Sequence, residues 1–283
     1  MSGVAVVTGA SRGLGLITAN HLHRQGWGVA AIARSAPNTA PWSTSDAEGI
    51  SGSGMFVNGD VASRDDMARC AESTRAHLGS ARLLICNAAI LGPIGRLHEL
   101  SATEYKRAIE VNFLGVVNTI AAYWSQLAEV SDARVIVVTG GGMGGPRPLL
   151  RAPAYVPSKA AVASLVEVLA PEFAEIGASI TAVAPGAVIP TDFLRSVSAI
   201  PPATAGAQLA NEAKIQRTAP ADAADGYLRL LDYLASAPGR QLNGVILSGR
   251  WNTASQLDDA LRDGLSPNMY RLRRIDGDLF DER

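Results

Sequence analysis

The sequence contains little cysteine: Cys70 and Cys86 are the two cysteines among its 283 residues. They lack the Cys-x-x-Cys spacing of zinc and redox sites, and two cysteines do not make a disulfide framework. A basic excess is also missing, because 25 Lys and Arg stand against 26 Asp and Glu, for a net charge of -1. This balance argues against nucleic-acid and membrane-surface partners. We expect a reduced, cytoplasmic protein.

Long apolar runs are absent as well. No stretch reaches the ~18 apolar residues that a membrane span requires. The chain passes from Met1 almost directly into the apolar run 4–7, and no secretory signal is visible there. Metal-ligand spacing is likewise missing from the four histidines, so no metal is expected. The histidines are His21, His23, His77 and His98.

The chain does contain short apolar runs that alternate with longer amphipathic segments. The expected strands are 4–8, 29–34, 55–58, 82–86, 134–139, 179–184 and 245–248. The expected helices are 13–24, 63–78, 101–124, 155–176 and 222–236, with Pro171 inside the fourth. This alternation predicts an α/β fold with a doubly wound, mostly parallel seven-stranded sheet and helices on both faces. We expect one domain over 1–249, with the polar residues 250–283 as its extension, a lid or an oligomer contact.

The first expected strand is followed by a glycine-rich turn, Thr8-Gly9-x-x-x-Gly13-x-Gly15. A turn between a strand and a helix with this spacing is typical of dinucleotide sites. Its glycines permit close backbone approach, and the amides at the helix N-terminus then face the pyrophosphate. The alternative is that these glycines serve the turn for steric reasons alone.

The type of dinucleotide depends on the end of the second expected strand. An acidic residue there would accept hydrogen bonds from the ribose hydroxyls of NAD. This chain has Ala33 and Arg34 instead, and it adds Arg12 inside the glycine turn. Two guanidinium groups suit a 2′-phosphate, so the sequence favours NADP(H). The alternative is two solvated surface arginines.

Tyr155 and Lys159 are four residues apart in an expected helix and therefore lie on one face, about one turn apart. A nearby ammonium group favours the ionised form of a phenol. A phenol tuned in this way can exchange a proton with a carbonyl or an alcohol. The pair alone is weak, because this spacing also occurs by chance on surface helices.

Five motifs occur in a fixed order along the chain. After the glycine turn come Asn87-Ala88-Ala89, Asn112 in Glu-Val-Asn-Phe-Leu-Gly, Tyr155-x-x-x-Lys159 and Pro185-Gly186. Together they resemble the short-chain dehydrogenase/reductase family in its compact form, over about 4–249. The resemblance implies a single-domain Rossmann fold, a small-molecule carbonyl or alcohol substrate, and a homodimer or homotetramer.

The resemblance also implies roles for individual residues. Tyr155 would be the general acid in carbonyl reduction, and Lys159 would bind the nicotinamide ribose and lower the pKa of that tyrosine. Asn112 would hold a water in a proton relay, or would simply cap a helix kink. Asp60 would contact adenine, or would be a plain helix cap. The expected cofactor-binding residues are Gly9, Ser11, Arg12, Gly13, Leu14, Gly15, Arg34, Asp60, Val61, Asn87, Ala88, Tyr155, Lys159, Pro185, Gly186, Val188 and Thr191.

The chain departs from the family pattern at the substrate-binding serine. That serine is expected about thirteen residues before the tyrosine, where this chain has Gly142 within the run 139–145. Thr139 is the hydroxyl residue at the end of the fifth expected strand. It can make the same hydrogen bond to a substrate oxygen. Thr139 would then be the fourth catalytic residue. The alternative is that it merely ends a strand and that the glycines after it let a substrate approach closely.

These observations lead to an NADPH-dependent ketoreductase that reduces a ketone or an aldehyde to an alcohol. Alternatives are an NADP-dependent alcohol dehydrogenase or epimerising enzyme on a sugar-like or natural-product substrate, and a regulator that binds NADP(H) without catalysis. The intact Tyr155, Lys159 and Asn112 argue against the regulator, because pure binding has little need of a tuned phenol.

Overall fold

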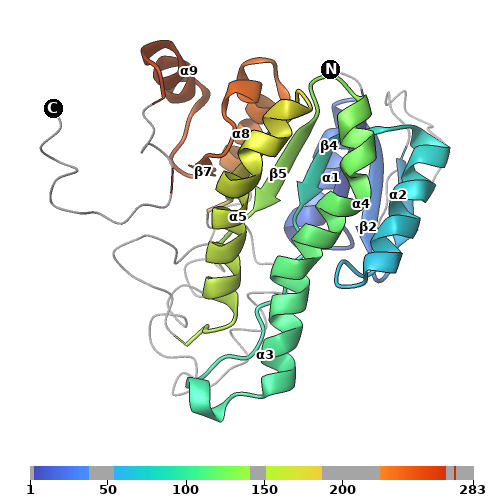
Figure 1. The fold of residues 1–283 in the computed structure, drawn as a ribbon, viewed down its shortest axis with the longest axis vertical. Coiled ribbons are helices and arrows are strands. Elements are labelled where there is room, and N and C mark those ends of the chain that lie inside the picture. Colours follow the sequence, from blue (N-terminus) through green and yellow to red (C-terminus); the bar gives the residue numbers. More distant parts are fainter. Residues whose placement is uncertain (1–2, 38–53, 141–150, 187–223, 266–270, 272–283) are drawn as a thin grey trace, which may run out of the picture.

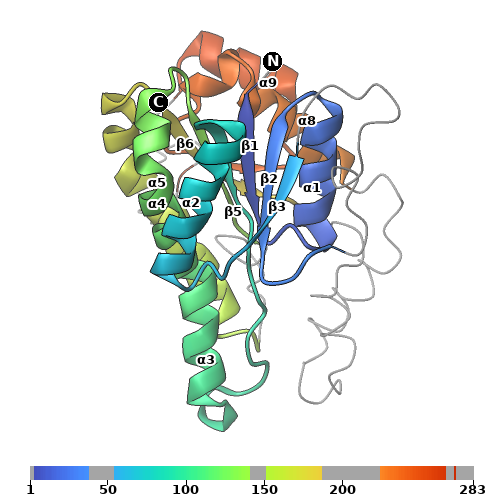
Figure 2. The same cartoon turned by 90° about the vertical axis from the view of Figure 1, so that its right-hand side faces the viewer.

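The computed structural model describes residues 3–37, 54–140, 151–186, 224–265 and 271. Within them, seven parallel strands form one sheet in the order β3-β2-β1-β4-β5-β6-β7 (Figures 1 and 2). The strands are β1 (Val4–Thr8), β2 (Gly28–Ala33), β3 (Gly54–Asn58), β4 (Ala81–Cys86), β5 (Arg134–Val138), β6 (Ser179–Ala184) and β7 (Ile246–Ser248). The predicted fold class is therefore confirmed.

Helices cover both faces of this sheet. They are α1 (Gly13–Arg24), α2 (Arg64–Leu78), α3 (Ala102–Ile109), α4 (Gly115–Glu129), α5 (Tyr155–Glu175), α8 (Asp225–Ala235) and α9 (Ala254–Asp263). In Figure 2, α1 and α2 lie on opposite sides of β1, β2 and β3. Helices α2, α4 and α5 supply one buried apolar cluster, and α1, α8 and α9 supply the other.

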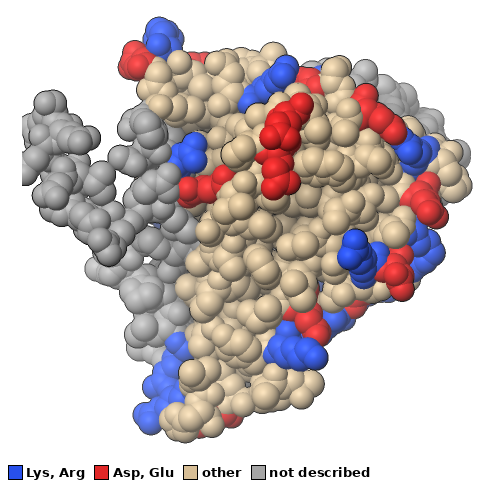
Figure 3. Space-filling model, viewed as in Figure 1, with Lys and Arg blue, Asp and Glu red and all other residues tan. Residues whose placement is uncertain are grey.

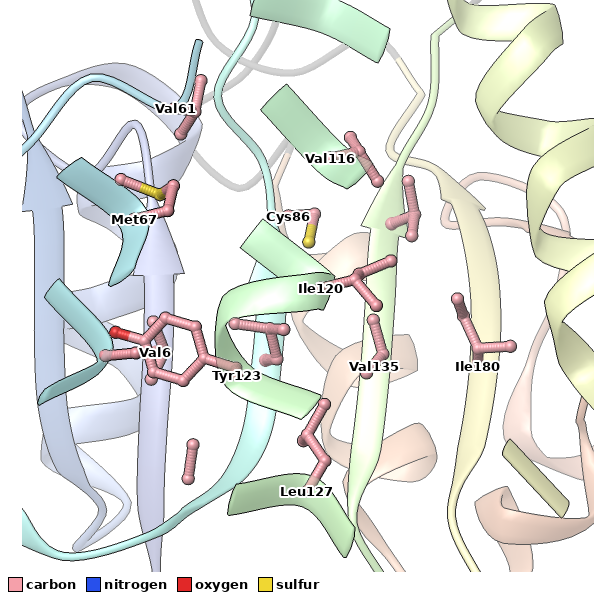
Figure 4. Close-up of a cluster of buried hydrophobic side chains, with 14 of the residues drawn as sticks. Val6, Val61, Met67, Cys86, Val116, Ile120, Tyr123, Leu127, Val135 and Ile180 are labelled. Atoms are coloured by element: carbon pink, nitrogen blue, oxygen red, sulfur yellow. The ribbon is translucent and has the colours of Figure 1, made fainter. Parts of the chain in front are cut away.

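The central strands are mostly apolar, as expected for strands with both faces covered. Every residue of β1 and of β5 is buried. Alternate residues of β1 enter opposite clusters: Val6 joins the first, whereas Ala5 and Val7 join the second. Figure 4 shows the first cluster, in which Met67 of α2 and Tyr123 of α4 pack over the sheet.

The strand order reverses between β1 and β4, since chain order runs outward from this pair toward both edges. In sheets of this kind, ligands bind outside the carboxyl ends of the strands at such a switch point. The glycine turn follows β1, and Asn87 follows β4. The topology therefore brings these two motifs to the same place.

Two helices differ from the expectation. The helix expected over 101–124 is instead α3, a π-helical segment (Glu110–Leu114) and α4 in succession, and it extends to Glu129. Helix α9 lies in the tail, where no helix was expected. Its start has a capping box of Thr253 and Gln256, and its Leu257 is fully buried in the second cluster. In the described parts of the chain, no helix has the length and apolar character needed to cross a membrane.

Candidate active site

The glycine turn packs directly against the residues that follow β4. Gly9 has a φ of +68°, and a Cβ there would lie 2.8 Å from Cα of Ala88. A Cβ on Gly15 would lie 2.3 Å from the carbonyl oxygen of Gly9 and 2.5 Å from Nδ2 of Asn87. Neither position has room for a side chain. Glycine is therefore required at both positions because the turn packs closely against the residues after β4. At Gly9 the left-handed backbone conformation of the turn favours glycine as well.

Hydrogen bonds hold the ends of β1 and β4 together at the switch point. The Asn87 side chain donates from Nδ2 to the carbonyl oxygen of Thr8 at 2.9 Å. The Thr8 hydroxyl accepts from the main-chain amides of Asn87 at 3.0 Å and Ala88 at 3.1 Å. Asn87 and Ala88, both expected cofactor-binding residues, therefore line the junction between the two strand ends.

The first turn of α1 is open to an anion. Arg12 is the N-cap residue, its side chain makes no capping hydrogen bond, and the first turn, which contains Leu14, has no acidic residue. In α2, by contrast, the Ser63 hydroxyl caps the amide of Asp66 at 3.2 Å. The leading amides of a helix need an acceptor, and a phosphate is well suited to them.

The two arginines expected at the cofactor ribose lie at neighbouring strand ends. The main-chain amide of Ala10 donates to Ile32 of β2 at 3.2 Å, which holds the glycine turn, with Ser11 and Arg12, beside β2. Arg34 directly follows β2, and its carbonyl oxygen accepts from Asn58 at 2.8 Å. Both arginine side chains are exposed. Residues 9–12 and 34–37 contain no acidic residue.

Asp60 and Val61 follow β3 at the same edge of the sheet. The Asp60 carboxylate accepts from the amide of Ala62 at 3.0 Å and pairs with Arg107 of α3. Val61 is buried, and a Cβ on Gly115 would lie 2.7 Å from its Cγ2. In the described structure the Asp60 side chain therefore orders its own loop and links it to α3. Its contact with adenine stays a prediction.

Tyr155 and Lys159 lie over the end of β5. The Lys159 ammonium group donates to the carbonyl oxygen of Val138 at 2.8 Å. The Tyr155 hydroxyl lies against Gly140, since a Cβ on Gly140 would be 2.3 Å from that oxygen. Lys159 thus contacts Val138 and Tyr155 contacts Gly140, the first and last of three consecutive residues. The middle residue is Thr139.

Burial shifts the pKa of both groups. Burial raises the pKa of the Tyr155 hydroxyl to about 12. Burial also lowers the pKa of the Lys159 ammonium group to about 8, and the nearby Cys86 opposes this shift. The expected lowering of the tyrosine pKa by Lys159 stays a prediction. Desolvation dominates among the described residues, and the ammonium group is engaged by Val138.

Thr139 carries a buried hydroxyl that is available to a ligand. Its main-chain amide donates to Val183 of β6 at 2.8 Å, which fixes the residue at the strand end. The side chain is buried, and within the described structure its Oγ1 has no hydrogen-bond partner. A buried hydroxyl without a partner is costly and points to a missing acceptor or donor.

Asn112 lies in the π-helical segment, fully buried. Its side chain donates to the carbonyl oxygen of Ile90 and accepts from the Ile90 amide, both at 2.8 Å. It also donates to the Ser158 hydroxyl at 3.0 Å, which in turn donates to the carbonyl oxygen of Tyr155 at 2.7 Å. Both side-chain N–H groups are used, so Asn112 links the loop after β4 to the start of α5. Its relay role stays a prediction.

The last expected motif, Pro185-Gly186, follows β6. Gly186 has a φ of +83°, and its Cα faces Arg250, whose Cβ would lie 3.2 Å from a Cβ at Gly186. Val188 and Thr191 lie outside the described residues. Among the residues that are described, no group of three or more acidic, histidine or cysteine residues could hold a metal ion.

Sequence reasoning missed the role of Gly140. The alternative to a catalytic Thr139 treated the glycine run after the fifth expected strand as room for a substrate. The first of these glycines instead makes room for the Tyr155 hydroxyl. A glycine between a strand end and the helix that carries Tyr155 was the available signal, but the partner, 15 residues away in the sequence, became visible only in the structure.

The chain matches the family model for short chain dehydrogenase over residues 3–200. It is 31% identical over 187 residues to cis-4-hydroxycyclohexanecarboxylate dehydrogenase of Sinomonas cyclohexanicum, covering 65% of this chain and 72% of that one. It is 29% identical over 191 residues to a 3-oxoacyl-acyl-carrier-protein reductase of Staphylococcus epidermidis, covering 67% and 76%. A solved structure of an alcohol dehydrogenase from Thermococcus sibiricus, complexed with 5-hydroxy-NADP, is 28% identical with a TM-score of 0.56, covering 65% and 76%.

Proposed function

The chain belongs to the short-chain dehydrogenase family, a family of oxidoreductases that use a nicotinamide cofactor, and from this premise we propose that it reduces a ketone or an aldehyde with NADPH. The observation that carries the proposal is the arrangement at the end of β5. Tyr155 and Lys159 lie over residues 138–140, beside the Thr139 hydroxyl, which has no hydrogen-bond partner among the residues that the structure describes.

The residues at the switch point fit a dinucleotide. The first turn of α1, where the Arg12 side chain makes no capping hydrogen bond, would bind the pyrophosphate. Gly9 and Gly15 have no side chains that could block the approach of the pyrophosphate to the backbone of the turn. When bound, the nicotinamide supplies the hydride that turns a carbonyl carbon into an alcohol carbon. Arg12 and Arg34 would hold a 2′-phosphate, which supports NADP(H). The bound 5-hydroxy-NADP of the Thermococcus sibiricus enzyme is in line with this choice.

Tyr155 is the proton donor in this proposal. With a pKa of about 12, its hydroxyl keeps its proton at neutral pH and can give it to the alkoxide that forms from the substrate. Thr139 would donate a hydrogen bond to the same substrate oxygen. Lys159, with a pKa of about 8, carries its charge at neutral pH and would stabilise the phenolate that Tyr155 becomes.

The same residues also serve alcohol oxidation, with Tyr155 as the base. One of the relatives is named as a dehydrogenase of a hydroxy acid and another as a reductase of an oxoacyl group, so both directions are represented among them. The direction in the cell follows the ratio of the cofactor forms. At neutral pH the Tyr155 hydroxyl carries its proton, which is the protonation state that carbonyl reduction requires.

The test is a panel of ketones and aldehydes, each supplied with NADPH and with NADH, followed by cofactor absorbance. The proposal predicts reduction of part of the panel and higher kcat/KM with NADPH. The corresponding alcohols with NADP⁺ cover the reverse direction. Turnover with NADH that equals or exceeds that with NADPH would overturn the cofactor assignment. A folded protein that binds NADPH and turns over nothing would support a regulator instead. Light scattering on the same sample tests the expected homodimer or homotetramer.

A further inference from the structure

A hollow lies beside the catalytic helix, outside the residues assigned so far. One wall is the connection from β4 to α3, and the other is the segment that leads into α5 together with the first turn of that helix. It is widely open to solvent, its volume is about 400 Å³, and its lining includes Arg96, Leu97, Arg151, Pro153, Val156 and Pro157. Val156 is the residue next to Tyr155, so the hollow begins within one helical turn of the proton donor.

The two walls are joined to each other and to α3. The amide of Gly95 donates to the carbonyl oxygen of Arg151 at 3.0 Å. The Tyr105 hydroxyl of α3 donates to the carbonyl oxygen of Pro153 at 3.2 Å. Arg151 itself has a φ of +66°, a left-handed conformation that costs a residue with a side chain about 1 kcal/mol or more. These bonds hold Arg151 at the hollow in spite of that cost.

The lining combines positive charge with apolar surface. Among the lining residues that the structure describes, the charged ones are two arginines and none is acidic. Neither arginine has a carboxylate at ion-pair distance within the part of the chain that the structure describes; the nearest acid in sequence, Glu99, pairs with His98 at 3.6 Å. Leu97, Pro153, Val156 and Pro157 provide the apolar part. In Figure 3, basic side chains gather at the lower left edge, where Figure 1 has this connection and the beginning of α5.

We propose that this hollow binds the carboxylate of the substrate through Arg96 and Arg151, and that the substrate is an oxo-carboxylate with an apolar body. Guanidinium groups match the planar carboxylate and form charge-assisted hydrogen bonds with it. The apolar lining accepts the hydrocarbon between the acid and the carbonyl group. The inference rests on the carbonyl reduction proposed above, because it assigns the carboxylate to the same molecule whose carbonyl group would be reduced at Tyr155.

The test compares oxo-carboxylates of increasing length, from 4-oxopentanoate to 9-oxodecanoate, with their neutral methyl esters. For the wild type we expect a KM about 10-fold or more lower for the best acid than for its ester. Arg96→Gln and Arg151→Gln each remove most of that difference and leave kcat and the KM of the ester in place. Arg151→Lys retains part of it. Arg229→Gln, on an exposed arginine of α8, is the matched control and changes nothing.

Calorimetry with the best acid and its ester, without turnover, separates this inference from the proposed function. Acid binding that requires both arginines, without reduction of any ketone, would overturn the reductase and keep the carboxylate site. Reduction of the esters with no preference for the acid would overturn the carboxylate site alone. A loss of acid and ester binding by the same factor in both arginine variants would also overturn it, because the arginines would then only support the fold.

Discussion

Replacing Gly140 with alanine tests the placement of Tyr155, the proposed proton donor. The new Cβ would lie 2.3 Å from the Tyr155 hydroxyl oxygen, 2.9 Å from its Cζ and 3.0 Å from its Cε1. Ordinary contact begins at 3.4 Å. The hydroxyl must therefore move by about 1 Å, and a misplacement of that size costs a catalytic group about 10²-fold in rate. Gly140 does not have a left-handed φ, so backbone strain adds nothing.

The same substitution has a predictable effect on stability. Overpacking a buried site lowers the free energy of unfolding by about 1–3 kcal/mol. Replacing glycine with alanine also reduces the conformational entropy of the unfolded chain, which raises the free energy of unfolding by about 0.4–1 kcal/mol. The net effect is destabilising. In a Tyr155→Phe background the closest atom is gone and the 2.9 Å contact remains, so part of the destabilisation is recovered.

Four proteins are compared: the wild type, Gly140→Ala, Tyr155→Phe and the double variant. The assays are steady-state kinetics, cofactor binding by fluorescence, and urea unfolding. We expect kcat of Gly140→Ala to fall about 10²-fold with cofactor affinity unchanged. A kcat within about 3-fold of the wild type, less than 1 kcal/mol of barrier, would refute the reasoning. The reasoning would also be refuted if Gly140→Ala lowered the free energy of unfolding equally in the wild type and in Tyr155→Phe.

Three further predictions concern the same site. Thr139→Val should lower kcat about 10²-fold or more while Thr139→Ser keeps most of it, measured with the best carbonyl substrate; a near wild-type rate for the valine variant removes Thr139 from the mechanism. Arg34→Asp should move the ratio of kcat/KM values toward NADH, because a carboxylate repels a 2′-phosphate and accepts from a ribose hydroxyl; an unchanged ratio contradicts the assignment. Lys159→Met should remove a pH dependence of stability. The folded pKa of about 8 lies below the ordinary value of 10.5, so between these values Lys159 binds more protons in the unfolded chain. Its contribution to the unfolding free energy therefore rises with pH, by at most about 1.4 kcal/mol per unit. Urea unfolding of both proteins from pH 8 to 10 should show that the unfolding free energy of the wild type minus that of the variant rises with pH, and parallel curves would contradict it.

Much of the fold could be predicted because the signals were local. The strand run at β5 is unbroken Val-Ile-Val-Val, which suits a strand covered on both faces, and its observed end differs from the prediction by one residue. The hydroxyls of Ser63 and Ser101 were correctly predicted to begin α2 and α3. The spacing of Tyr155 and Lys159 also placed both on one helical face without tertiary information.

The missed features depend on contacts between distant residues. The π-helical segment forms where the side chain of Asn112 reaches the main chain of Ile90, 22 residues earlier, and no periodicity reports such a bond. The pKa of Tyr155 depends on how deeply the fold buries it, which spacing does not reveal. Helix α9 was missed because its segment is polar and buries one residue, Leu257, although its Thr253 and Gln256 carried a readable capping signal.

The most direct test of the central claim is the turnover of Tyr155→Phe. Phenylalanine keeps the ring in its buried place and removes only the proton donor, so the fold and cofactor binding should persist. NADPH oxidation with the best carbonyl substrate should fall by at least about 10²-fold, the smallest contribution usual for a positioned general acid. Wild-type cofactor affinity with lost turnover is the predicted result. A variant that binds NADPH and still reduces the substrate at a rate close to the wild type would contradict the account.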